Sequence, residues 1–346
     1  MTNAAPYPLV LEPILKAKVW GGRKLEQFGK TLPESDPIGE SWELADLDST
    51  STSGGGGDSA HSKITNGSLA GQSIRDALKQ WGSQLIDESK LTPTGGFPLL
   101  VKYLDAREHL SVQVHPSPDY ANSHEDAHLK TESWLILQAD EGAMLYKGLK
   151  PGTTKDDLKR AIETNTVPDL LIAEPAVVGQ CHTLPSGTVH ALGAGVLVAE
   201  VQTPSDTTFR VYDWAKEYGR EGRELHIDQA LECADFGSAP EPVSASTASA
   251  MGRTARTNVA QTNYYTMDLI TASCAAVDLS TDNAPLVIML PKTMGASIAS
   301  KSGAFNETEL RAGQTVLIPA AIAQDTQLRA GPDTLAVIAT IGAGQR

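Results

Sequence analysis

Four side chains that can bind a divalent metal ion stand in three strand-like segments of the sequence. Gln113 and His115 lie two residues apart in an apolar run, so on a strand both would project from one face. Glu132 stands near the start of the next run, and His190 ends the segment Pro-Ser-Gly-Thr-Val-His. Two imidazoles, a carboxylate and an amide oxygen can hold a divalent metal and leave positions for water or substrate. Zinc suits this donor set, and manganese, iron, cobalt or nickel could also occupy it.

Each of these residues taken alone has a simpler interpretation. A single histidine on a strand is more often a hydrogen-bonded core residue than a ligand, and Glu132 alone is more often a solvated charge at a sheet edge. The combination in strand contexts, with Gly179, Pro185 and His190 at regular spacing, favours a metal site instead.

The elements that must position these side chains are predicted to be mostly strands. Short runs rich in Val, Ile, Leu and Thr are separated by Pro and Gly, which number 20 and 30. Several such runs in series predict a sandwich or barrel. Helical patterns are fewer, over residues 71–86 and 153–165. We therefore expect a mainly β fold with a few helices inserted in the N-terminal part.

The composition of residues 237–257 predicts a linker between two units. We expect a catalytic unit over residues 1–236 and a smaller β unit over residues 258–346. A repeat supports the division, because Gly179–His190 and Gly313–Gln324 both place Gly and Pro six residues apart. The common unit would be a Gly turn, an apolar strand, a Pro-led turn and a return strand. The simpler interpretation is two unrelated hairpins.

Bulk properties exclude several classes of protein. Lys and Arg number 28 and Asp and Glu number 42, for a net charge of −14, which argues against nucleic acid or an anionic membrane as the main partner. An anionic substrate would need local attraction by a metal or a few focused cations. No apolar run approaches the roughly 20 residues of a membrane span, and no signal peptide is indicated, so we expect a cytoplasmic protein. The 3 cysteines are far apart and support neither a disulfide framework nor a thiolate zinc site.

Two spaced motifs in the sequence resemble known ones. The spacing Gly179-x5-Pro185-x-Gly187-x2-His190 resembles the second cupin motif. Gln113-x-His115 followed by Glu132 resembles the first, with Gln in the usual first His position and an insertion before the Glu.

Three further motifs make the resemblance specific: GESWE at 39–43, WGG at 20–22 and SDTTFRVYDW at 205–214. Together the motifs are similar to type I mannose-6-phosphate isomerases, and most similar to the short bacterial branch of that family. The similarity runs from about residue 7 to 236 and continues more weakly through the C-terminal unit. It implies a bicupin of two jelly-roll β-barrels that interconverts mannose 6-phosphate and fructose 6-phosphate through an enediol.

The resemblance also implies roles for particular residues. Gln113, His115, Glu132 and His190 would hold one zinc ion, and Arg210 would be the catalytic arginine. The residues themselves agree for Arg210, because Phe209 and Val211 alternate with Arg210 and Tyr212 and so predict that Arg210 and Tyr212 share a face. The alternative is an arginine on a solvated outer face.

Three more charged residues are expected at the site. Glu200 matches an acidic position of the family's pocket and would either transfer a proton or orient a metal ligand. Lys130, two residues before Glu132, would act in catalysis or bind the phosphate or a sugar oxygen, unless it is a solvated surface lysine. Lys102 is charged within an apolar strand and is expected to border the same cavity and bind substrate.

Two other functions remain open from the sequence. A cupin oxygenase or oxidoreductase using iron or manganese would share the metal ligands but would need neither a phosphate-binding cation nor Arg210. A non-catalytic sugar-binding bicupin is the other. The C-terminal unit is expected to bind no metal, because Gln324 stands at the ligand position of the repeat and no histidine follows His226.

Overall fold

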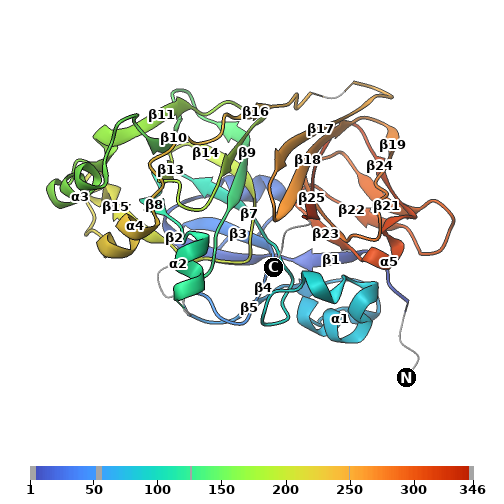
Figure 1. The fold of residues 1–346 in the computed structure, drawn as a ribbon. Helices are drawn as coiled ribbons and strands as arrows, with labels where there is room; N and C mark the ends of the chain where they lie inside the picture. Colours follow the sequence, from blue (N-terminus) through green and yellow to red (C-terminus); the bar gives the residue numbers. More distant parts are fainter. Residues whose placement is uncertain (1–4, 52–56, 125–126, 249, 343–346) are drawn as a thin grey trace.

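The computed structural model describes residues 5–51, 57–124, 127–248 and 250–342, and strands dominate it (Figure 1). The prediction of a mainly β protein is confirmed. Within those ranges, none of the helices has the length and apolar character that crossing a membrane requires.

Two sheets form the half of the molecule that contains the predicted site (Figure 1). The larger has seven strands in the order β16-β12-β9-β14-β7-β2-β3, and the smaller has five in the order β11-β10-β13-β8-β15. The bounds of the larger sheet are β2 (Ile14–Gly22), β3 (Ile38–Leu44), β7 (Leu100–Ala106), β9 (Glu132–Ala139), β12 (Gln180–Leu184), β14 (Val196–Gln202) and β16 (Val243–Ser244). Those of the smaller are β8 (Val112–Val114), β10 (Met144–Leu149), β11 (Leu171–Pro175), β13 (His190–Leu192) and β15 (Phe209–Tyr212).

The other half also has two sheets, with seven and four strands. The seven-stranded sheet contains β17 (Thr254–Gln261), β18 (Tyr265–Ala272), β25 (Thr334–Ile341), β20 (Leu286–Lys292), β23 (Thr315–Ile318), β1 (Leu9–Glu12) and β6 (Lys63–Ile64). The four-stranded sheet contains β19 (Ala275–Asp278), β24 (Thr326–Ala330), β21 (Ala296–Ser300) and β22 (Thr308–Leu310). A separate pair joins β4 (Asp46–Leu47) to β5 (Ala60–His61). The α-helices are α1 (Ile74–Trp81), α2 (Pro118–Ser123), α3 (Lys155–Thr164), α4 (Ile227–Cys233) and α5 (Ala320–Ala323).

The two longest helices lie where their sequence patterns predict them. Ser73 caps α1: its hydroxyl accepts a hydrogen bond from the backbone nitrogen of Asp76, and the Asp76 carboxylate accepts one from the backbone nitrogen of Ser73. Thr154 and Asp157 make the same capping box at the start of α3. Reciprocal capping satisfies backbone groups that the first turn leaves unpaired, which fixes where each helix begins.

Strand alternation divides the core into layers. In β9, Leu135 packs in the cluster that contains Met267 of the other half, whereas Trp134 and Ile136 pack in a different cluster with Leu192 of the five-stranded sheet. Because successive side chains of a strand face opposite sides, one seven-stranded sheet presents one face to the smaller sheet and its other face to the second half of the molecule. The two seven-stranded sheets therefore pack back to back.

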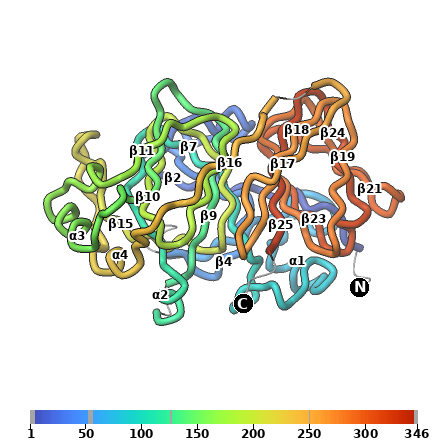
Figure 2. The backbone as a smooth tube through the Cα atoms, turned by 45° about the horizontal axis from the view of Figure 1, so that its top comes forward, coloured from blue at the N-terminus to red at the C-terminus, as the bar shows by residue number. Residues whose placement is uncertain are grey.

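Several segments of the chain connect the halves. Strand β1 leaves the N-terminal part and pairs with β23, with Leu9 opposite Leu317 (Figure 1). Within residues 237–257, β16 pairs with the edge of β12, where Ser244 lies opposite Gln180, and this segment runs between the two halves in Figure 2. The chain also returns to the C-terminal half at β6, which pairs with β1, so it crosses between the halves at its beginning and around β6 as well as along the expected linker.

The internal repeat is only partly reproduced in space. Gly179 and Gly313 both have positive φ, 86° and 81°, and a strand follows each. After Pro319 the turn takes the form of the short helix α5, which Gln324 ends on the surface, and the return strand β24 begins at Thr326. In the first copy Gly187 adopts φ 89°, a conformation that glycine tolerates and alanine does not, whereas the second copy has the helix-favouring run Ala-Ala-Ile-Ala. The turn after Pro319 is therefore helical and longer than in the first copy, and the return strand follows it as β24.

A buried ion pair lies where β3 meets the C-terminal half. Lys30 Nζ lies 2.6 Å from Glu43 Oε1, and the two side chains are 4% and 1% exposed. Ser41 donates a hydrogen bond to Glu43 Oε1 over 2.6 Å, and Thr315 of β23 donates to Oε2 over 3.2 Å. Lys30 also donates to the carbonyl oxygen of Gly313 over 3.2 Å. The pair is thus satisfied from both halves of the molecule at once.

We expect Lys30→Met to lower the free energy of unfolding by about 3–5 kcal/mol, because it leaves the Glu43 carboxylate buried without its counter-ion. Urea denaturation followed by fluorescence measures the shift. Lys79→Met, on the exposed face of α1, removes the same charge and is the control. Adding Glu43→Gln to Lys30→Met should recover part of the loss. Equal denaturation midpoints for Lys30→Met and Lys79→Met would contradict the assignment.

Candidate metal and substrate site

Three of the predicted ligands form one buried cluster between the two sheets of the N-terminal half. Glu132 opens β9, His190 opens β13, and His115 follows β8. His190 Nε2 lies 3.0 Å from Glu132 Oε1, and His115 Nε2 lies 3.5 Å from Glu132 Oε2. One ligand atom from each residue lies within 4.8 Å of the other two, and all three residues are buried. Each sheet thus supplies part of the set.

Hydrogen bonds behind the two imidazoles fix their tautomers. His115 Nδ1 lies 2.9 Å from the carbonyl oxygen of Thr207, and His190 Nδ1 lies 2.8 Å from that of Thr188. A carbonyl oxygen only accepts, so each Nδ1 carries a proton and a neutral ring turns its Nε2 lone pair toward Glu132. Burial lowers the pKa of His115 to about 3, which keeps that ring neutral. Lone pairs that face a carboxylate are satisfied by a cation between them, so the donor set fits a divalent metal.

Gln113 and Lys130 complete the surroundings of this cluster. Gln113 is paired directly with His190 across β8 and β13, and its amide nitrogen lies 3.3 Å from His190 Nε2. A half-turn of the amide exchanges its nitrogen and oxygen, so either can face the cluster. Lys130 Nζ lies 2.6 Å from Glu132 Oε2 and 3.0 Å from His115 Nε2. Burial opposes ionisation of Glu132, but Lys130 and His115 hold its pKa well below the ordinary value.

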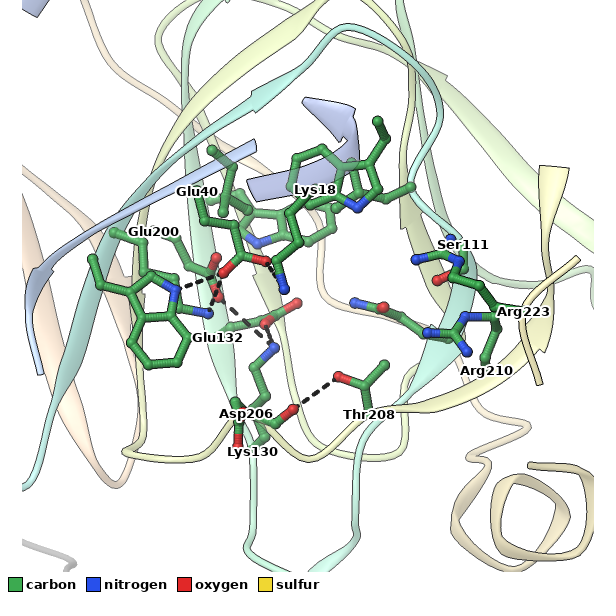
Figure 3. A pocket seen from close by; sticks show the side chains of 17 residues that line it. Lys18, Glu40, Ser111, Lys130, Glu132, Glu200, Asp206, Thr208, Arg210 and Arg223 are labelled. Carbon is green, nitrogen blue, oxygen red and sulfur yellow. Dashed lines mark hydrogen bonds and ion pairs between the residues drawn. The ribbon is translucent and has the colours of Figure 1, made fainter. Parts of the chain in front are cut away.

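A cavity adjoins the cluster, with Gln113 and Glu132 in its lining (Figure 3). Three tryptophans, Trp20, Trp42 and Trp134, contribute to its walls. Its polar lining consists of Lys18, Glu40, Lys102, Ser111, Gln113, Lys130, Glu132, Glu200, Asp206, Thr208, Arg210 and Arg223. The structure therefore brings Lys102, Lys130, Glu200 and Arg210, all singled out in the sequence, to one cavity.

Lys102 and Glu200 lie in a row of side chains that runs across neighbouring strands of the larger sheet. Lys102 on β7 lies opposite both Trp42 on β3 and Glu200 on β14, and Glu200 lies opposite Trp134 on β9. Burial raises the pKa of Glu200 to about 8, and the charge of Glu132 adds to the rise while Lys102 opposes it. A carboxyl group that titrates near neutral pH can both accept and return a proton.

Sequence reasoning missed Lys18 and Glu40. Lys18 Nζ lies 3.2 Å from Glu40 Oε1, and Trp42 Nε1 donates a hydrogen bond to Glu40 Oε2 over 2.6 Å. Burial opposes ionisation of Glu40, but Lys18 and Lys102 lower its pKa to about 2. The alternation of Glu40 and Trp42 with Ser41 in β3 was the available signal, because residues two apart share a face.

Arg210 lies in β15 directly opposite Gln113, and its side chain lines the cavity. The expected shared face with Tyr212 is wrong. The register shifts between Arg210 and Tyr212, which marks a bulge, and Tyr212 packs instead in the apolar cluster with Phe209 and Val211. A bulge inserts an extra residue and so reverses the alternation beyond it.

Ser111 and Arg223 were also missed. Ser111 stands two residues before Gln113, so strand spacing could have found it. Arg223 lies in the loop between β15 and α4, where no periodic pattern predicts the direction of a side chain. Burial, followed by the charge of Arg223, lowers the pKa of Arg210 to about 10.

Comparison with known proteins assigns the chain to a family. The chain is 38% identical over 237 residues to mannose-6-phosphate isomerase ManA of Bacillus subtilis, which covers 68% of this chain and 70% of that relative. The chain belongs to the type I mannose-6-phosphate isomerase family. Residues 9–141 match the family model of the type I phosphomannose isomerase catalytic domain.

Solved structures agree with this membership. The crystal structure of the mannose 6-phosphate isomerase from Bacillus subtilis has a TM-score of 0.80 at 27% identity and covers 96% of this chain and 99% of that one. A zinc-bound mannose 6-phosphate isomerase has a TM-score of 0.71 at 15% identity, with 96% and 99% coverage, and this likeness shows the fold. The likeness thus extends over both halves of the molecule.

We expect the purified protein to carry about one divalent metal ion per chain, and His115→Ala or His190→Ala to carry almost none, because each removes one of few donors. Plasma emission spectrometry after dialysis measures the content. His124→Ala, just after α2 and outside the cluster, is the matched control and should retain the metal. Full occupancy in both His115→Ala and His190→Ala would rule out this ligand set.

Proposed function

We propose that this protein interconverts mannose 6-phosphate and fructose 6-phosphate, with one divalent metal ion held by Gln113, His115, Glu132 and His190. The observation that carries the proposal is the buried His-Glu-His set at a cavity that also contains Glu200 and Arg210, in a member of the type I isomerase family. Zinc fits the two imidazoles and one carboxylate, and a zinc-bound isomerase shares the fold. When bound, the ion would act as a Lewis acid toward sugar oxygens.

The reaction moves a proton between C2 and C1 of the open-chain sugar through an enediol. Glu200 is the proposed proton carrier: its carboxylate takes the proton from C2 of mannose 6-phosphate and returns it to C1, while the O2 proton passes to O1. The raised pKa of Glu200, to about 8, suits a group that must both bind and release a proton. Lys102 lies directly opposite Glu200, and Lys130 Nζ lies 3.9 Å from its Oε1.

The cationic side chains near Glu200 also have proposed roles. Arg210 stabilises negative charge that develops on the sugar oxygens, because a guanidinium fixed in place before the reaction needs no reorganisation. Lys102 and Lys130 bind sugar oxygens and orient the reacting carbons. A cupin oxygenase would not require so many cations, so the 5 Lys and Arg residues that line the cavity favour an anionic substrate.

The arrangement of sheets supports a bicupin architecture as the scaffold for this reaction. We assign residues 1–236 to a catalytic cupin unit, 237–257 to a linker, and 258–346 to a degenerate cupin-like unit whose role is structural. The back-to-back packing of the two large sheets supports that role, since Met267 and Val337 cover the outer face of the sheet that holds Glu132.

A coupled assay with fructose 6-phosphate tests the activity. Mannose 6-phosphate should form, a chelator such as EDTA should abolish its formation, and added zinc should restore it, because the ligand set cannot itself polarise the sugar oxygens. Chromatographic identification of the product separates mannose 6-phosphate from other hexose phosphates. No conversion by the zinc-loaded protein in either direction would refute the proposed reaction.

Arg210→Ala should retain its metal but lose at least about 100-fold in kcat, the scale of removing one preorganised charge donor. Arg256→Ala, on β17 in the far sheet, removes the same charge outside the cavity and should leave kcat unchanged. Metal analysis and steady-state kinetics on both variants make the comparison. Turnover of Arg210→Ala at the rate of the unaltered protein would place this arginine outside the reaction.

A further inference from the structure

A second cavity lies on the other side of β7 from the metal and substrate site. Leu104 lines the first cavity, whereas its neighbour Asp105 lines the second, because successive side chains of a strand face opposite sides. The second lining comes from the end of β2 and the residues just after it, the loop before β3, the end of β7 and the turn after β9. Among the residues that the structure describes, the two cavities have no lining residue in common.

The glycines of the WGG motif leave space for a carboxylate of this second cavity. A Cβ atom at Gly21 would lie 2.4 Å from the backbone nitrogen of Gly39, and one at Gly22 would lie 2.5 Å from Asp105 Oδ2. Cβ atoms do not approach other heavy atoms that closely, and glycine in a strand often marks such a close approach. The motif therefore keeps β2 close to β3 and leaves room for Asp105.

Asp105 is a buried carboxylate with one unsatisfied oxygen. The residue is 1% exposed. Its Oδ2 accepts a hydrogen bond of 2.6 Å from the backbone nitrogen of Lys24, whereas its Oδ1 has no hydrogen-bond partner among the described residues. Burial raises the pKa of Asp105, and the hydrogen bond from Lys24 only partly offsets that rise. A buried polar group is costly without a partner, so Oδ1 lacks a donor that the protein itself does not supply.

The unpaired charge around this cavity is negative. Each cation of the lining already pairs with a carboxylate: Lys24 with Asp140 at 2.7 Å, Arg107 with Glu108 at 2.9 Å, and Arg23 with Glu26. Glu34 and Asp36 also belong to the lining and are exposed, and in the described part of the chain neither they nor Asp105 form an ion pair. Three carboxylates thus remain uncompensated, and the ligand that they favour is a cation.

The spacing of the carboxylates favours an extended organic cation over a metal ion. Within the described ranges, His115, Glu132 and His190 are the one group of three such side chains close enough to share an ion. Glu34, Asp36 and Asp105 are therefore too far apart to hold one metal ion together. A primary ammonium group donates up to three hydrogen bonds, as in lysine, so one ammonium can satisfy Asp105. A second ammonium on the same molecule can then reach the exposed carboxylates.

We propose that this second cavity binds an aliphatic diamine, with one ammonium group on Asp105 and the other at Glu34 and Asp36. The site is separate from the proposed isomerase site. The inference therefore does not depend on the identity of the sugar phosphate.

Calorimetry of the zinc-loaded protein with 1,4-diaminobutane tests the proposal. The diamine should bind at about one site per chain, and Asp105→Asn should raise its dissociation constant about 10- to 100-fold, as expected for losing a hydrogen bond to a charged group. An asparagine keeps an oxygen for the backbone nitrogen of Lys24 but places an amide donor where Oδ1 stood. The matched control is Asp119→Asn on the exposed face of α2, which should leave the dissociation constant unchanged.

A second variant tests the other end of the ligand and does not alter a buried residue. Glu34→Gln combined with Asp36→Asn should raise the dissociation constant of the diamine about 3- to 10-fold, because exposed ion pairs are weak. The same double variant should bind 1-aminobutane as the unaltered protein does, since a monoamine has no second ammonium group. Thermal unfolding without ligand shows whether each variant is folded.

Three results would overturn the proposal. The first is no binding of the diamine to the unaltered protein at millimolar concentration. The second is equal dissociation constants for the unaltered protein and Asp105→Asn. The third is displacement of the diamine by an equal concentration of Mg²⁺, which keeps several waters and binds through one or two carboxylates, because the cavity would then be a site for a hydrated metal ion.

Discussion

The site depends on one seven-stranded sheet that is buried on both faces. Strands β9, β14, β7 and β3 send alternate side chains to the cavity and to the core shared with the C-terminal half. In β9, Glu132 and Trp134 line the cavity, whereas Ser133 makes a hydrogen bond of 2.9 Å with Tyr265 of β18. Because a strand cannot move one face without moving the other, packing of the C-terminal half determines where the chemically active side chains lie.

Burial of so many charges imposes a second constraint, since a buried charge is costly unless it is paired. On the sheet side of the cavity, Lys102 and Lys130 are compensated by Glu40 and Glu132. On the opposite side, no carboxylate among the described residues forms an ion pair with Arg210, and Arg223 pairs with Asp213. The cavity is therefore polarised: its balanced wall suits proton transfer and metal binding, and its positive wall suits an anion.

The sequence predicted the parts of this site that follow strand periodicity or a spaced motif. Gln113 and His115 share a face in an alternating run, and the Gly-Pro-His spacing located His190. The sequence did not predict the position of side chains where the strand periodicity is interrupted. A bulge after Arg210 turned Tyr212 into the apolar core, the turn after Pro319 formed the short helix α5, and Arg223 is placed by a loop that is held through Asp213. Such features depend on tertiary contacts that single-sequence patterns do not contain.

The alternation in β3 limits how this protein can change during evolution. Glu40 and Trp42 face the cavity, while Ser41 and Glu43 face Thr315 and the buried Lys30. Deleting or inserting one residue within the strand would exchange the two sets. Glu43 would then be exposed to substrate, and Glu40 would turn toward an apolar core. Substitutions at individual positions can accumulate, but gain or loss of single residues should be confined to the loops. The length of β3 is therefore constrained more strictly than the identity of its residues.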